Sequence, residues 1–290
     1  MFPEDICQII ASFITNLNLR LTCKTFSKCK FKITCSNKNM YFHKINEIFD
    51  IYRYIHEYGQ LPDILDYEEV VINTTVTFPS LLNCKILRCP STKINKLPDL
   101  PNCEELNCSS TEISELPNLP KCKKLNCSST EISELPNLPK CKKLDCSNTS
   151  VNELPNLSKC EELVCFGTSI RELPDLPKCK ILNCFGTSIS ELPNLPNCEE
   201  LNCFYTNVSE LSNLPKCKIL NCFSTSISEL PNLPKCKILN CFSTSISELP
   251  NLPNCEELYC SNTKISELPN LPKCKILYCS NTSINKLPLY

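Results

Sequence analysis

Apolar and polar positions repeat with a period of 19 residues from residue 78 onward. A typical copy, Leu116 to Glu134, reads L-P-x-L-P-x-C-x-x-L-x-C-x-x-T-x-I-x-x. Within it, Leu125 and Cys127 alternate with polar neighbours, which predicts a short strand with one face in the core. The Leu-Pro-x-Leu-Pro arm favours an extended return segment, because proline fixes φ and lacks an N–H group. Eleven copies of the core predict a repeat solenoid, a parallel β-sheet with one strand per copy and extended convex arms.

Residues 1–45 follow a helical pattern instead. Pro3, Glu4 and Asp5 form a typical helix start, with proline in the first turn and acidic side chains at the positive end of the helix dipole. Apolar residues then recur at helical spacing, which predicts a small α-helical module. The two apolar faces comprise Ile6, Ile9, Ile10 and Phe13 in the first segment, and Leu19, Cys23 and Phe26 in the second.

Residues 46–77 connect this module to the repeats. An apolar run that ends before Gly59 predicts a helix with a glycine stop. Val70 and Val71 then suggest a strand that begins the sheet. We therefore expect a linker and N-terminal cap over 46–77, and a solenoid of eleven repeats plus a truncated last one over 78–290.

Cysteine is unusually frequent, and 22 of the 26 cysteines lie in two columns of the repeats, as do Cys103 and Cys108. A metal site needs convergent thiolates or histidines, and the two histidines, His43 and His56, lie outside the repeats. Disulfides need Cβ atoms closer than in-register parallel strands place them. We therefore interpret the columns as small buried core side chains, with metal binding or redox chemistry as the alternatives, and expect no metal or cofactor.

The charges are balanced, with 30 basic and 31 acidic residues, which argues against nucleic-acid binding. The outward column that contains Glu161 and Lys180 mixes both signs and is interpreted as a solvated structural face. The chain lacks the long apolar run of a membrane span, so no membrane association is expected. Its amino terminus also lacks the pattern of a secretory signal, so we expect reduced thiols and a cytoplasmic or nuclear location.

Three columns of outward-facing strand positions are expected across the repeats, and the third changes from serine to phenylalanine in five successive copies. An exposed apolar patch of this kind usually marks a binding surface, and aromatic residues are favoured anchors. The alternative is that stacked rings stabilise the sheet itself. The predicted partner-binding residues are Phe166, Phe185, Phe204, Phe223, Phe242, Ile181, Ile219 and Ile238, with Tyr205, Tyr259 and Tyr278 at one end.

The core of each copy resembles the leucine-rich-repeat consensus L-x-x-L-x-L-x-x-N-x-L. Cys122, Cys127 and Ile132 stand at three of its leucine positions, and Thr130 stands at its asparagine position. The family's inward asparagine satisfies backbone groups in the turn after the strand. A threonine hydroxyl can donate and accept hydrogen bonds, so we predict a threonine ladder with the same purpose. The resemblance implies an unknown target protein on the concave face.

Residues 2–26 resemble an F-box, a family that opens with Leu-Pro and an acidic pair and closes on L-R-L-x-C-K-x-[WF]. The segments 2–5 and 19–26 match those parts. The resemblance implies docking onto the Skp-type adaptor of a cullin complex. The combination of this segment with nearly identical cysteine-rich repeats also looks like proteins of giant DNA viruses of amoebae. That resemblance implies a location in the host cell. The implied adaptor-binding residues are Phe2, Pro3, Ile6, Ile9, Ile10, Phe13, Leu19, Leu21, Cys23 and Phe26.

Catalysis needs unique groups that converge, whereas every glutamate, serine and threonine of interest here recurs in register. We therefore expect no catalytic residues and no enzyme activity. The leading hypothesis is the substrate receptor of an SCF-type cullin ubiquitin ligase. The alternative is a scaffold or decoy that binds a partner protein without a link to ubiquitin, with residues 1–45 as a helical cap of the first repeat.

Overall fold

The computed structural model describes residues 69–71, 78 and 81–286. The chain divides into two compact units. The first unit contains the described residues up to Cys122 together with Asn126–Ile132, and the second contains Lys123–Leu125 and the described residues from Ser133 onward. The helical module predicted for residues 1–45 and the helix predicted before Gly59 lie outside the described residues.

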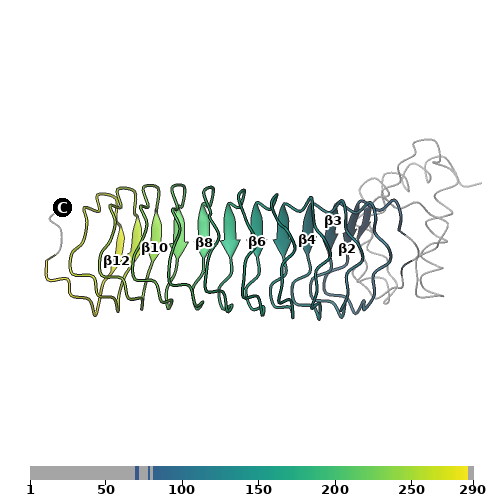
Figure 1. The fold of residues 1–290 in the computed structure, drawn as a ribbon, viewed down its shortest axis with the longest axis horizontal. Helices are drawn as coiled ribbons and strands as arrows, with labels where there is room; N and C mark the ends of the chain where they lie inside the picture. The colour runs from purple at the N-terminus through teal and green to yellow at the C-terminus, as the bar shows by residue number, and fades with distance from the viewer. Residues whose placement is uncertain (1–68, 72–77, 79–80, 287–290) are drawn as a thin grey trace, which may run out of the picture. The chain divides into compact units, whose positions relative to one another are not determined.

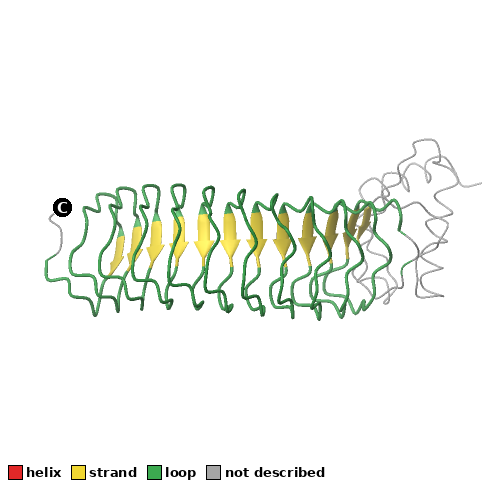
Figure 2. Cartoon of the chain, viewed as in Figure 1, coloured by secondary structure: helices red, strands yellow, loops and turns green. Residues whose placement is uncertain are grey.

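The second unit contains a parallel β-sheet in which every strand is three residues long. Strands pair in register at a spacing of one repeat, so that Glu200 lies between Ile181 and Ile219. The strands lie side by side, and each is followed by a turn and a return segment of loop (Figure 1 and Figure 2). They are β5 (Lys143–Asp145), β6 (Glu162–Val164), β7 (Ile181–Asn183), β8 (Glu200–Asn202), β9 (Ile219–Asn221), β10 (Ile238–Asn240), β11 (Glu257–Tyr259) and β12 (Ile276–Tyr278).

The first unit has the same parallel pairing in β1 (Glu69–Val71), β2 (Ile86–Arg88) and β3 (Glu105–Asn107). The strand predicted around Val70 is therefore present as β1. The Arg88 guanidinium joins this unit's strands, because it lies 3.0 Å from the Glu69 carboxylate and 2.8 Å from that of Glu105. A further strand, β4 (Lys124–Asn126), falls at the boundary between the units. The predicted parallel β-solenoid with a 19-residue period is confirmed by the spacing of the strands.

Each turn of the second unit except the last, which contains β12, buries the same five kinds of side chain. In one turn these are Cys179, Leu182, Cys184, Ile189 and Leu195, all with 0% of their surface exposed. Two short thiols per turn suit a narrow core between a strand and its return segment. The predicted structural role of the cysteines is confirmed, since 20 of the 22 described thiols are buried and none forms a disulfide.

The turn after each strand contains one residue in the left-handed conformation, such as Gly186 with φ 64°. The next residue is always threonine. The hydroxyl of Thr187, for example, donates a hydrogen bond to the main-chain oxygen of Cys184 at 2.6 Å. The predicted threonine ladder is thus confirmed, and each hydroxyl closes its own turn. Within the described residues, we find no helix with the length and apolar character to cross a membrane.

Candidate functional site

A stack of four phenylalanine rings crosses the second unit just beyond strands β6 to β9. The centroids of successive rings from Phe166 through Phe185 and Phe204 to Phe223 are 4.4, 4.3 and 4.5 Å apart, and the planes are within 11° of parallel. In-register pairing produces this stack, because equivalent residues of adjacent strands lie about 4.8 Å apart. Main-chain bonds such as Gly186 N–H to Phe204 O, at 3.0 Å, extend the pairing into the turns. Each ring is half-buried.

The phenylalanine column lies in the turns and not on the strands, so the expectation of a third strand column is wrong. Strands β6 and β7 end at Val164 and Asn183, two residues before the phenylalanine. The residue after each phenylalanine is left-handed, with φ 65° at Gly167 and 64° at Gly186, and this conformation turns the chain out of the sheet. The stack therefore borders the sheet face. Phe242 continues the column and is 38% exposed.

Tyr205 has φ 52°, at a turn position that holds glycine, serine or asparagine in the other described turns. Its ring stands edge-on to Phe204 at 5.8 Å and to Phe223 at 5.0 Å, and the residue is 61% exposed. Tyr205 therefore lies beside Phe204 and Phe223, the last two rings of the stack. An alignment of the repeats could have singled out Tyr205, because it is the one aromatic residue at a repeat position that otherwise holds small or polar residues.

Strands β7 to β9 present a carboxylate between two apolar side chains. Glu200 of β8 faces Ile181 and Ile219 across the sheet, and all three residues are half-buried. The next outward position along each strand is asparagine. The side-chain oxygens of Asn183 and Asn221 are buried and receive no hydrogen bond from the described residues. This face thus combines apolar surface with the carboxylate of Glu200, whereas the two amide oxygens are covered.

The two other predicted tyrosines form a separate pair on β11 and β12. The rings of Tyr259 and Tyr278 are stacked with centroids 5.3 Å apart, and Tyr278 is 59% exposed. The Tyr259 hydroxyl donates to the Glu257 carboxylate at 2.9 Å, which raises the pKa of Tyr259. Ile238 of β10, in register with Glu257, is half-buried. The predicted site residues therefore form two groups, the phenylalanine stack with Tyr205 and this tyrosine pair.

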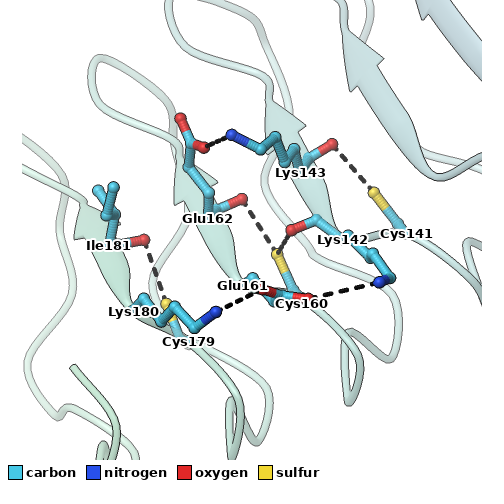
Figure 3. Close-up of polar contacts among 9 residues, drawn as sticks. All are labelled: Cys141, Lys142, Lys143, Cys160, Glu161, Glu162, Cys179, Lys180 and Ile181. Carbon is cyan, nitrogen blue, oxygen red and sulfur yellow. Dashed lines mark hydrogen bonds and ion pairs between the residues drawn. The ribbon is translucent and has the colours of Figure 1, made fainter. Parts of the chain in front are cut away.

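The cysteines are arranged for structure rather than reactivity. The thiols of Cys141, Cys160 and Cys179 donate to the main-chain oxygen two residues further on, at 3.2, 3.1 and 3.2 Å (Figure 3). Burial raises the pKa of Cys160 to about 11 and that of Cys184 to about 12, and a protonated thiol is a poor nucleophile and metal ligand. Among the described residues, no group of three or more histidine, cysteine, aspartate or glutamate side chains is placed to hold a metal ion.

Unlike charges pair along the column that includes Glu161 (Figure 3). The Lys180 ammonium lies 2.7 Å from the Glu161 carboxylate, and that of Lys142 lies 3.6 Å from it. Lys143 pairs with Glu162 in the adjoining column. The hydrogen bond from Lys180 and its charge lower the pKa of Glu161. The prediction of a solvated structural face is confirmed, because these pairs are exposed and join successive turns.

The adaptor-binding residues predicted between Phe2 and Phe26 lie outside the described residues. The candidate site among the described residues is therefore the face of the second unit formed by the phenylalanine stack, Tyr205 and the outward side chains of β7 to β9.

No protein-family model and no curated protein matches the chain. The similar solved structures are leucine-rich-repeat proteins. The functional domain of InlJ from Listeria monocytogenes, which includes a cysteine ladder, is 26% identical with a TM-score of 0.63. That alignment covers 71% of this chain and 51% of the InlJ domain, so the chain spans about half the length of that domain.

Two further structures show the same fold at lower identity. A leucine-rich-repeat protein from Leptospira interrogans is 23% identical with a TM-score of 0.55, over 72% of this chain and 69% of its own. YopM, a leucine-rich effector protein from Yersinia pestis, is 21% identical with a TM-score of 0.52, over 84% of this chain and 89% of its own. These similarities show that the described repeats have a leucine-rich-repeat fold.

Proposed function

We propose that the chain is a non-enzymatic protein-interaction scaffold whose repeats hold a partner protein on the aromatic face of the second unit. The observation that carries this proposal is the continuous phenylalanine stack with Tyr205, 61% exposed, beside it. Continuous exposed apolar surface usually marks an interaction site, and aromatic side chains contribute a large share of interface energy. The leucine-rich-repeat fold of the similar structures supports the same role.

The conformation of Tyr205 gives a second argument. A left-handed conformation costs a residue other than glycine about 1–2 kcal/mol, and such strain clusters at functional sites. Serine and asparagine occupy the same position in other turns with the same φ, for example 53° at Asn148. The fold therefore does not need tyrosine here, which supports a role in binding.

The phenylalanines are equally dispensable for the turn itself. Ser147 fills the same repeat position in the preceding copy, where its hydroxyl donates to Asp145 at 2.6 Å. That copy has the same turn, with a left-handed residue at Asn148. Stacked rings do contribute about 0.5–1.5 kcal/mol per pair, but the fold forms without them. Five successive phenylalanines therefore add an apolar surface that the fold does not require.

The test of this function is to replace two phenylalanines with the residue that other copies use. Partners captured by the full-length protein would be identified, purified and titrated against the wild-type protein and the Phe204→Ser/Phe223→Ser variant. We expect the variant to bind at least about tenfold more weakly, as loss of anchor residues at an interface implies. The control is Glu210→Gln, on an exposed return segment. Equal affinity of wild type and the double variant would overturn the proposed face.

We also propose that this scaffold is the substrate receptor of an SCF-type cullin ubiquitin ligase. The support is the resemblance of residues 2–26 to an F-box, with its Pro-acidic opening and its L-R-L-x-C-K-x-F ending. In this arrangement residues 1–45 bind the Skp-type adaptor, the repeats bind the target, and the other ligase subunits carry out the chemistry. The protein would then act in the cytoplasm or nucleus.

The receptor role can be tested separately from the scaffold role. The purified full-length chain would be mixed with a purified Skp-type adaptor and analysed by size-exclusion chromatography. We expect a complex that is lost in an Ile6→Asp/Ile10→Asp variant and retained in the Phe204→Ser/Phe223→Ser variant. If the wild-type protein forms no complex, the receptor proposal fails and the scaffold proposal stands.

A further inference from the structure

We infer that the face formed by β7, β8 and β9 binds a segment of the partner protein that carries an arginine between two apolar side chains. This inference rests on the proposed function and specifies the chemistry of the partner. Two features of the face support it: an unpaired carboxylate at its centre and isoleucines on both sides.

The carboxylate of Glu200 is the central feature. Its in-register neighbours across the sheet are Ile181 and Ile219, neither of which can neutralise it. Among the described residues, no basic side chain pairs with Glu200, although it is half-buried. A partly desolvated carboxylate gains more from an opposite charge than a fully solvated one does.

Glutamates at the same repeat position in nearby strands are satisfied within the chain. Glu162 of β6 forms an ion pair with Lys143. Glu257 of β11 accepts a hydrogen bond from the Tyr259 hydroxyl at 2.9 Å. Glu200 therefore occupies the same repeat position as these two glutamates but lacks, among the described residues, a neighbouring side chain that pairs with its carboxylate. A donor group from outside the chain would give Glu200 the partner that the other two glutamates already have.

The amide oxygens on either side of β8 are buried, so a ligand on this face contacts the carboxylate and not these oxygens. Asn183 and Asn221 each have a side-chain oxygen without a hydrogen-bond donor among the described residues. The equivalent oxygen of Asn240 accepts from the Phe242 N–H at 3.2 Å. A guanidinium group has five N–H donors and no acceptor, and its fork can bind several oxygens at once. Arginine thus fits the unpaired carboxylate better than lysine does, because its fork can bind both carboxylate oxygens.

The isoleucines on either side of Glu200 determine which side chains should flank the arginine in the partner's segment. Ile181 and Ile219 lie about 10 Å apart, because adjacent strands are spaced about 4.8 Å. An extended segment places alternate side chains about 6.6 Å apart on one side, so an apolar-x-Arg-x-apolar sequence crosses the three strands obliquely. The phenylalanine stack borders this row and extends the apolar surface.

The test is a selection from a random peptide library displayed on phage, with the full-length protein as bait. Selected peptides would be synthesised and titrated against the wild-type protein and the Glu200→Gln, Glu200→Lys and Phe204→Ser/Phe223→Ser variants. Glu191→Gln, an exposed glutamate on a return segment, is the matched control. We expect peptides that carry arginine between apolar residues. Their affinity should fall about tenfold with Glu200→Gln and further with Glu200→Lys, and should not change with Glu191→Gln.

Two contrary results can be told apart. Peptides that lose affinity with Phe204→Ser/Phe223→Ser, but lack a basic residue or bind Glu200→Gln as well as wild type, would overturn this inference and leave the binding face intact. Selected peptides that are insensitive to the phenylalanine replacements as well would overturn both this inference and the proposed face.

Discussion

The ring of Tyr205 stands edge-on against the ring of Phe223, with centroids 5.0 Å apart and planes inclined at 77°. The two residues belong to successive turns of the second unit, so the contact joins one repeat to the next. Tyr205 reaches this place only because its backbone is left-handed, with φ 52°. An aromatic contact and a strained conformation thus occur together at one exposed position.

We predict that Tyr205→Asn weakens partner binding while leaving stability nearly unchanged. Asparagine adopts the left-handed conformation at a lower cost than tyrosine, and this gain offsets part of the loss of edge-to-face contacts worth about 0.5–1.5 kcal/mol each. The free energy of unfolding, measured by urea denaturation, should stay within about 1 kcal/mol of the wild-type value. Partner affinity should drop about tenfold. A large loss of stability with full affinity would show that Tyr205 is structural.

Serine should be tolerated in one cysteine column and harmful in the other. The thiol of Cys217 donates to Ile219 O at 3.2 Å, and a serine hydroxyl can make the same bond. Cys222 is fully buried, and its thiol makes no hydrogen bond to the described residues. A hydroxyl there would be buried without a partner, so Cys222→Ser should cost about 1–3 kcal/mol more than Cys217→Ser.

The two alanine variants are the controls for this comparison. Cys217→Ala and Cys222→Ala remove similar volume from the same turn, so their unfolding free energies should differ less than those of the serine pair. If the two serine variants were equally stable, the hydrogen bond of the first column would have no structural role.

The solenoid should lose stability steeply in alkali. Burial raises the pKa of Cys89 to about 12 and that of Cys160 to about 11, whereas a thiol in an unfolded chain has a pKa of about 8.5. Above that pH the unfolded state releases protons that the folded state keeps, so the free energy of unfolding falls as pH rises. Each thiol removes up to about 1.4 kcal/mol per pH unit, and 20 buried thiols act together.

Urea unfolding followed by circular dichroism at pH 7, 8.5 and 9.5 measures this effect. At pH 8.5 about half of the thiols of the unfolded chain are ionised, and each thiol removes about 0.4 kcal/mol, so stability should already be lower than at pH 7 and should be much lower at pH 9.5. A Cys217→Ala/Cys222→Ala variant should show a shallower slope, because two fewer thiols ionise on unfolding. Equal stability at pH 7 and 9.5 would contradict the burial of the thiols.

Two glutamates of the second unit should respond in opposite directions to the same substitution. Glu199 pairs with Lys218, and this contact lowers the pKa of Glu199, so Glu199→Gln should lower the urea midpoint. Glu210 lies in an exposed column of eight glutamates without described basic partners, so Glu210→Gln should raise stability by a few tenths of a kcal/mol. The column comprises Glu134, Glu153, Glu172, Glu191, Glu210, Glu229, Glu248 and Glu267.

Salt provides the check on this charge argument. High ionic strength screens exposed charges, so both substitutions should lose most of their effect on the urea midpoint in 1 M salt. Effects that persist unchanged in salt would point to packing or hydrogen bonding instead of charge.

The repeat sequence predicted the inward side of the solenoid closely. Leu182 and Cys184 alternate with outward residues, and both are fully buried. Thr187 follows the left-handed residue and bonds to Cys184 O, as expected of a turn-closing hydroxyl. These assignments depend only on the position of a residue within one repeat, and the same pattern recurs in each copy at a period of 19 residues.

The outward side was predicted less well. Phe204 was expected on a strand and lies in a turn, where the ring of Tyr205 stands edge-on to it. Hydrophobic periodicity predicts which residues face the core, but it does not predict where a three-residue strand ends. The end is set by the left-handed residue that follows, and its φ is a property of the folded backbone.

By itself the sequence determined the fold class, the core side chains and the roles of cysteine and threonine, because these follow from local periodicity and from the polarity of each position. Only the tertiary structure decided which residues of different copies meet. It stacked Phe204 between Phe185 and Phe223, and it placed Glu200 between two isoleucines. Such neighbours are one repeat apart in sequence but adjacent across the sheet, so their pairing depends on the register of the strands.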